Sequence, residues 1–105
     1  MPRLPDFGGF TEPAILILTS LAKGPAHGYA IVKDVEELAS VHLGPGTLYA
    51  AISRLEARGL IEALEPLERR RPYRITGAGE QFLRERLRTL ARVARVGMER
   101  LEPSS

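Results

Sequence analysis

The first apolar segment of the chain has almost no polar positions. Residues 14–18 are all apolar, and Leu21 follows one helical turn later. Thr11 is expected to cap this helix, with Glu12 in its first turn, and Gly24 to end it. A helix that is apolar nearly all round must be covered on more than one side. So short a chain supplies little to cover it, which favours a partner subunit.

A second helix is predicted for residues 27–39. Ile31, Val35 and Leu38 form an apolar stripe at spacings of four and three residues, and charged side chains occupy the opposite face. Residues 40–44 are then expected to form a turn. The pattern therefore predicts two helices joined by a short connection.

A third helix is predicted for residues 45–58, because Pro45 suits its first position and Gly59 suits the residue after its end. Its buried stripe is expected to consist of Leu48, Ile52 and Leu55. At about 100° per residue, the positions on or near its outward face are Gly46, Tyr49, Ala50, Ser53, Arg54 and Ala57. Small and polar residues along an outward face permit close approach to another surface.

A short β-hairpin is predicted between the third helix and a fourth. Residues 60–64 form its first strand, and residues 72–75 form the return strand, with Pro72 at the start or on an edge. The loop between them holds three consecutive arginines, which are Arg69, Arg70 and Arg71. The sequence thus predicts a hairpin with a basic tip.

A long final helix is predicted for residues 77–101, beginning at Thr76 or Gly77. Its apolar seam repeats at alternating spacings of four and three: Leu83, Leu87, Leu90, Ala94, Gly97 and Leu101. A helix of this length spans about 37 Å and projects beyond a small core, so a second copy of the chain is the expected partner. The residues expected at this dimer contact are Ile15, Leu18, Leu83, Leu87, Leu90, Ala94, Met98 and Leu101.

Composition excludes several kinds of site. The chain has 105 residues, close to one small domain, with no cysteine and two histidines. Disulfides and thiolate metal sites are excluded, and neither a metal nor a cofactor is expected. No Ser-His-Asp order and no phosphate-loop spacing is present, so no enzyme is expected. No apolar run could span a bilayer and the N-terminus lacks signal-peptide order, so the expectation is a cytoplasmic protein without a membrane partner.

Charge is divided unevenly along the chain. Residues 1–43 carry a net charge of −2, whereas residues 44–105 carry +4, and every basic residue in the second part is arginine. The planar guanidinium suits phosphates and guanine edges, so the asymmetry favours a nucleic-acid partner. A solvated helix face remains the alternative from charge alone.

The order of elements matches a winged helix-turn-helix, an α+β fold that is mainly α. Residues 1–10 are expected to form a flexible arm, 11–76 a DNA-binding domain, and 77–105 a C-terminal dimerisation helix. In such a fold the third helix enters the major groove of double-stranded DNA, and the wing contacts phosphates or the minor groove. The expected DNA-binding residues are Gly46, Thr47, Tyr49, Ala50, Ser53, Arg54, Arg69, Arg70 and Arg71.

Several of these residues also have a structural interpretation. Tyr49 contacts DNA or packs beneath the wing, and Thr47 contacts DNA or only satisfies the helix start. Tyr29 is expected to support the helix-turn-helix. His27 is expected to cap or pack at the start of the second helix.

Four motifs in order then resemble the PadR family of bacterial transcriptional regulators. They are HGYAI at residues 27–31, PGTLY at 45–49, LEARGLI at 55–61 and RRPYRITGAG at 70–79. The chain departs from the family pattern at Gly44, usually serine, and at Pro72, usually lysine or tyrosine. Pro72 removes one backbone donor and is expected to affect pairing in the wing.

The resemblance implies a homodimeric winged-helix repressor whose C-terminal helix packs against the partner's first helix, as in the compact subfamily. It also implies that some members respond to phenolic acids or planar drugs near the dimer interface. A flat ligand would find Phe82 in the final helix and Phe7 and Phe10 in the arm, so an effector of unknown identity stays open. The expected function is repression from a pseudo-palindromic operator. The alternatives are a winged-helix protein–protein module and an architectural DNA binder without sequence preference.

Overall fold

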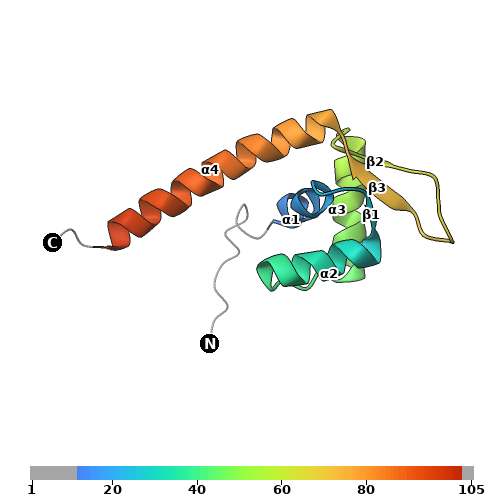
Figure 1. The fold of residues 1–105 in the computed structure, drawn as a ribbon, viewed down its shortest axis with the longest axis horizontal. Coiled ribbons are helices and arrows are strands. Elements are labelled where there is room, and N and C mark those ends of the chain that lie inside the picture. Colours follow the sequence, from blue (N-terminus) through green and yellow to red (C-terminus); the bar gives the residue numbers. More distant parts are fainter. Residues whose placement is uncertain (1–11, 103–105) are drawn as a thin grey trace.

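The computed structural model describes residues 12–102 (Figure 1). In chain order the elements are α1 (Pro13–Leu21), β1 (Ala26–His27), α2 (Gly28–Ala39), α3 (Pro45–Ala57), β2 (Ile61–Ala63), β3 (Pro72–Ile75) and α4 (Gly77–Leu101). The predicted winged helix-turn-helix with a long C-terminal helix is confirmed. The expected arm of residues 1–10 and the cap by Thr11 lie outside the described residues. Within residues 12–102, no helix has the length and apolar character needed to cross a membrane.

α1 lies at the centre of the core, where it contacts α2, α3, α4 and β3. Ile17 and Leu18 are 0% exposed, and Ile15 is also buried. The chain itself therefore covers this helix, and the expectation that α1 requires a partner subunit for cover is wrong. The periodicity of one helix shows how many of its faces are apolar, but not how many elements of the same chain pack around it.

The ends of the first and third helices follow local backbone rules. Glu12 occupies the N-cap position of α1, one residue before the first turn predicted to contain it. At the end of α3, Gly59 has a φ of 73°, which is the left-handed region that favours glycine. The Leu60 N–H donates to the Leu55 carbonyl at 2.9 Å, and the Gly59 N–H donates to Glu56. This pair of bonds is a Schellman motif, which ends α3 and turns the chain into β2.

The predicted apolar stripe of α2 is right for two residues and wrong for the third. Ile31 and Val35 are fully buried, but Leu38 is 53% exposed. Residues 36–40 are all exposed, because the last turn of α2 extends past the core. The stripe of α3 is buried as predicted at Leu48, Ile52 and Leu55, with Ala51 beside them.

The wing is part of a three-stranded antiparallel sheet in the order β1-β3-β2. The sequence predicts only the hairpin of β2 and β3, because β1 has two residues and so gives no alternating pattern. β1 pairs through Ala26 with Tyr73 and through His27 with Pro72. Pro72 stands at the first position of the central strand, where proline is tolerated, and its carbonyl accepts from the Leu64 N–H at 2.9 Å.

The first turn of α4 is held tightly against the chain around Leu60. The Thr76 side chain caps α4 by accepting from the Gly79 N–H at 3.0 Å, and its hydroxyl donates to the Gly59 carbonyl at 2.7 Å. The Thr76 N–H donates to the Leu60 carbonyl at 3.0 Å. A Cβ on Gly79 would overlap that same carbonyl oxygen. Only glycine therefore allows this contact, which joins α4 to the end of α3.

We expect Gly79→Ala to destabilise the fold by about 1–3 kcal/mol, because the new methyl group meets a backbone carbonyl that cannot rotate away. Gly77→Ala is the matched control, since a Cβ there meets nothing within 4 Å. The control should unfold at the wild-type temperature or slightly above it, because alanine has the higher helix propensity. Thermal unfolding followed by circular dichroism checks both variants. Equal melting temperatures for the two variants would contradict the close-packing explanation.

Candidate nucleic-acid interface

The outward face of α3 carries small and polar side chains that the rest of the chain leaves open. The residues predicted for this face are all exposed: Gly46, Tyr49, Ala50, Ser53, Arg54 and Ala57. Thr47, the other α3 residue expected to contact DNA, is exposed as well. A Cβ on Gly46 would meet nothing within 4 Å. The surface can therefore approach a partner closely along its length, and Arg54 supplies a positive charge near its end.

Tyr49 is partly exposed and partly packed against the start of α2. Its side chain is 50% exposed, yet its hydroxyl oxygen lies only 2.5 Å from where a Cβ of Gly28 would be. Leu48 also comes within 3.3 Å of that position. Gly28 thus lets α3 pack directly on the start of α2. The HGY and PGTLY motifs therefore meet at this contact, although Gly28 and Gly46 lie 18 residues from each other in the sequence.

The tip of the wing is a tight turn rather than the predicted seven-residue loop. Leu67 and Arg70 exchange two backbone hydrogen bonds, at 2.7 and 2.9 Å. Between them Glu68 and Arg69 have φ values of 50° and 69°. Positive φ at both central residues defines a type I′ turn, in which Asn-Gly is the favoured pair. The chain therefore places Arg69 at an apex in a strained backbone conformation.

The three wing arginines have different surroundings although all are exposed. Arg70 Nη1 lies 3.1 Å from His27 Nε2, and Arg71 Nη1 donates to the Leu64 carbonyl at 3.2 Å. Arg69 has no hydrogen-bond partner within residues 12–102. Two of the three guanidinium groups are thus held near the body of the protein, and the one at the apex is available to a partner.

An open hollow of about 480 Å³ connects α2, α3 and the wing. It is lined by His27, Gly28, Tyr29, Tyr49, Arg69, Arg70, Arg71 and Tyr73. The structure thus brings Tyr49 together with all three predicted arginines. Arg54 lies elsewhere, beside Arg58 and the start of α1, where it lines a hollow of about 310 Å³.

The two residues assigned structural roles differ in outcome. His27 stands at the N-cap position of α2, as predicted, with its Nδ1 at 3.3 Å from the Ala30 amide nitrogen. The prediction that Tyr29 supports the helix-turn-helix is wrong, since its ring is exposed and lies 5.8 Å from the Lys33 ammonium. Tyr73 is the buried aromatic residue instead. Its burial raises the pKa of its hydroxyl, so this side chain stays neutral beside the arginines.

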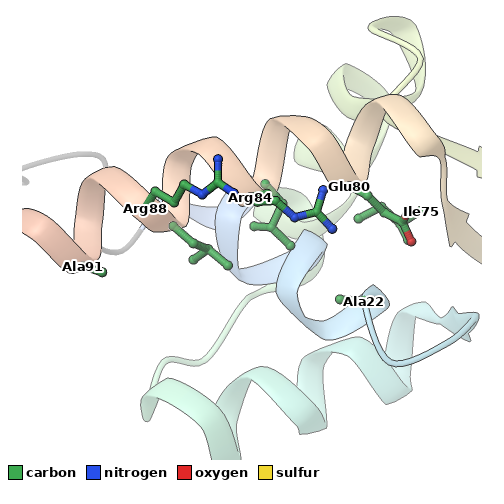
Figure 2. A pocket seen from close by; sticks show the side chains of 8 residues that line it. Ala22, Ile75, Glu80, Arg84, Arg88 and Ala91 are labelled. Atoms are coloured by element: carbon green, nitrogen blue, oxygen red, sulfur yellow. The ribbon is translucent and has the colours of Figure 1, made fainter.

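A third hollow, of about 460 Å³, lies between the end of α1, the end of β3 and α4 (Figure 2). Its lining is largely apolar and consists of Ala22, Ile75, Leu83, Leu87 and Ala91 together with Glu80, Arg84 and Arg88. Figure 2 shows Arg84 and Arg88 lying along α4, with Ala22 opposite. The site can accept an apolar group with an anionic end.

The C-terminal half of α4 leaves apolar side chains uncovered, and in Figure 1 it runs out past the other helices. Met98 is 59% exposed and Leu101 is 78% exposed. Of the residues expected at a dimer contact, Leu87, Ala94, Met98 and Leu101 are exposed, Leu90 is half-buried, and Ile15, Leu18 and Leu83 are buried. Leu18 in particular has no surface left for a second chain. Across residues 12–102, no group of three His, Cys, Asp or Glu side chains could hold a metal ion.

A family model described as the transcriptional regulator PadR-like family matches residues 17–85. A PadR family transcription regulator from hypervirulent Clostridium difficile R20291 shares the fold with a TM-score of 0.77 at 30% identity, over 86% of this chain and 98% of that one.

Two curated relatives are longer than this chain. An uncharacterized 37.1 kDa protein in transposon TN4556 of Streptomyces fradiae is 44% identical over 79% of this chain and 24% of its own length. The transcriptional regulator YqjI of Escherichia coli K12 is 30% identical over 79% of this chain and 41% of its own length. The chain thus spans less than half of these two relatives.

We expect Arg69→Gly to raise the unfolding free energy by about 1 kcal/mol, because glycine adopts a positive φ without strain. Arg71→Gly is the matched control, since Arg71 does not have a positive φ and donates to Leu64. It should lower stability instead. Urea unfolding of both variants checks the sign, and a loss of stability in Arg69→Gly would show that the wing turn is not strained.

Proposed function

Because this chain belongs to the PadR-like family of transcriptional regulators, we propose that it acts as a homodimeric repressor on a DNA operator in the cytoplasm. The family makes it a transcriptional regulator rather than an enzyme. The observation that carries the proposal is the single hollow shared by Tyr49 of α3 and the three wing arginines. A duplex that contacts α3 also reaches the wing.

We assign base recognition to α3. The major groove is about 12 Å wide and admits one helix, and of the α3 residues predicted to contact DNA only Tyr49 and Arg54 are bulky. Thr47 and Tyr49 stand in its first turns, which enter the groove first in helix-turn-helix proteins. Ser53 follows along the same face, and Arg54 lies at its edge, beside the start of α1.

We assign phosphate contact to the wing. Arg69 stands at the apex of the turn with its guanidinium unpaired within the described chain, and Arg70 and Arg71 flank the hollow. Arginine binds phosphate oxygens through a planar fork, which fixes position on the duplex without reading sequence. The strain at Arg69 supports a functional reason for keeping arginine there in place of glycine.

We assign dimerisation to α4. Its uncovered side chains, from Leu87 to Leu101, continue the heptad-like seam and suit a second copy of the same helix. A two-fold dimer places its two recognition helices about 34 Å apart, which is one turn of DNA. The operator is therefore a pseudo-palindrome with half-sites one turn apart.

The hollow beside α4 is the proposed effector site. Its apolar lining and the guanidinium groups of Arg84 and Arg88 suit a small organic anion. A ligand there contacts both α4 and the end of β3, so it links the dimer helix to the wing.

Repression itself needs only a DNA-binding surface and a dimer contact, and α3, the wing and α4 supply candidates for both.

The remaining alternatives are a protein–protein module and an architectural DNA binder without sequence preference. The arginines at the wing favour DNA over a protein partner. Selection of bound duplexes from a random library at about 150 mM salt separates all three. We expect an enriched inverted repeat with half-sites about 10 base pairs apart. Binding only at low salt without enrichment indicates an architectural binder, and no binding indicates a protein module.

Arg69→Ala with Arg70→Ala should weaken binding to every duplex and reduce the salt slope by about 0.9 for each phosphate that the wing no longer neutralises. Ser53→Ala should instead change the preferred sequence. Arg100→Ala removes an equal charge from the far end of α4 and serves as the control for net charge. Binding isotherms at several salt concentrations check the slopes. If Arg100→Ala reduces the salt dependence of binding as much as the wing variant does, the assignment of phosphate contact to the wing is refuted.

Met98→Glu should convert the dimer to a monomer, because it places a charge on the uncovered seam of α4. Thr89→Glu adds the same charge on the opposite, exposed face of α4 and should remain dimeric. Analytical ultracentrifugation checks both variants. A monomeric wild-type protein at micromolar concentration would exclude the seam as a stable dimer contact.

A further inference from the structure

His27 holds two positions in the fold at once. It is the N-cap of α2, where its Nδ1 lies 3.3 Å from the Ala30 amide nitrogen. Its other ring nitrogen, Nε2, lies 3.1 Å from Nη1 of Arg70 in the wing. Both neighbours of the imidazole are therefore hydrogen-bond donors, one from the backbone of α2 and one from a residue 43 positions later in the chain.

A neutral imidazole cannot accept both hydrogen bonds. It carries a proton on one ring nitrogen and a lone pair on the other, so it accepts at a single atom. A backbone N–H always donates, and an arginine guanidinium has no acceptor. His27 can thus cap α2 through Nδ1 or hold Arg70 through Nε2. Only one of the two hydrogen bonds can form at a time. The N–H group of the other pair then lies against the protonated ring nitrogen, which cannot accept from it.

We propose that His27 and Arg70 form a phosphate-responsive switch that couples DNA contact by the wing to capping of α2. This inference rests on the proposed function. In the free protein the Nε2 lone pair accepts from Arg70. When a DNA phosphate oxygen takes the Arg70 guanidinium, the ring proton moves from Nδ1 to Nε2 by exchange with water, and no net charge is gained. The Nδ1 lone pair then accepts from the Ala30 N–H.

The free state follows from the strengths of the two bonds. A hydrogen bond from a charged guanidinium is roughly twice as strong as one from a neutral amide. The distance to Arg70 is also the shorter of the two. The cap of α2 is therefore incomplete until Arg70 leaves.

A phosphate is the ligand that fits the bound state. Once the proton is on Nε2, the imidazole N–H and the Arg70 guanidinium both point donors at the same hollow, and the N-terminus of α2 adds its positive dipole. The other charged groups around His27 are Lys23, Lys33, Asp34, Glu37 and Glu68 on the adjoining surface hollows, with Arg69 and Arg71 in the wing. Lys23 donates a hydrogen bond to the Asp34 carboxylate at 3.0 Å, which lowers the pKa of that carboxyl. The ammonium charge of Lys23 offsets the carboxylate charge of Asp34 at this place.

The test is nitrogen-15 NMR of the histidine ring at about pH 8, where imidazole side chains are neutral. Arg70→Ala in the free protein should move the lone pair from Nε2 to Nδ1 and slow hydrogen exchange at the Ala30 amide. Arg71→Ala removes a neighbouring guanidinium that does not touch His27, and it should leave the ring spectrum unchanged. An unchanged tautomer in Arg70→Ala overturns the switch.

The selected operator duplex should produce the same change in the wild-type ring spectrum. If the duplex binds and the tautomer stays as it was, the switch is wrong while the proposed function stands. If no duplex binds, the proposed function fails, and the Arg70→Ala spectrum still decides whether the exchange between the two donors exists.

Two substitutions separate the two ring nitrogens. His27→Asn keeps an acceptor at the cap, where asparagine is favoured, but has no atom at the position of Nε2. It should retain the wild-type melting temperature and bind the operator about three- to tenfold more weakly, because one phosphate hydrogen bond is absent. His27→Gln reaches Arg70 but caps poorly, which is the arrangement proposed for the free protein, so it should melt near the wild-type temperature and keep a side-chain donor for the phosphate. Identical operator affinities for the two variants would overturn the proposal.

Discussion

The rest of the structure depends on the contact between the first turn of α4 and the carbonyl group of Leu60. That carbonyl accepts from the Thr76 N–H, and Gly79 lies against it with no room for a side chain. The Schellman turn at Gly59 ends α3 at the same place. One backbone group therefore sets the angle between α3, proposed to read DNA, and α4, proposed to form the dimer. A small rotation there changes the distance between the two recognition helices of a dimer.

The elements with strong local signals were predicted almost to the residue. The bounds of β3 and the start of α4 at Thr76 or Gly77 follow from composition and helix-start rules that act within a few residues. β1 could not be predicted, since two residues have no periodicity and pair only because β3 lies beside them. The exposure of Leu38 depends on where the core ends in space, and no spacing along a helix contains that information.

The candidate site likewise contains features that the sequence predicts and contacts that only the folded structure reveals. Exposure along α3 follows from helical geometry, so the outward residues were found from spacing alone. The position of Tyr49 against Gly28 and that of Arg70 against His27 join segments far apart in the chain. The signal for the first was present, because a glycine before a helix often marks close approach of another backbone or ring. No such signal exists for the second contact, which forms only when the wing turn brings Arg70 back to α2.

Glu68 has a consequence for how fast the protein would find its operator. It shares the apex of the wing turn with Arg69, and Glu65 stands at the base of the same loop. Two carboxylates among three guanidinium groups leave residues 65–71 with a net charge of only +1. In the proposed function the wing would therefore hold any stretch of duplex weakly, since non-specific binding comes from net positive charge. A repressor with such a wing would leave non-target DNA quickly and spend less of its search time on the wrong sequences.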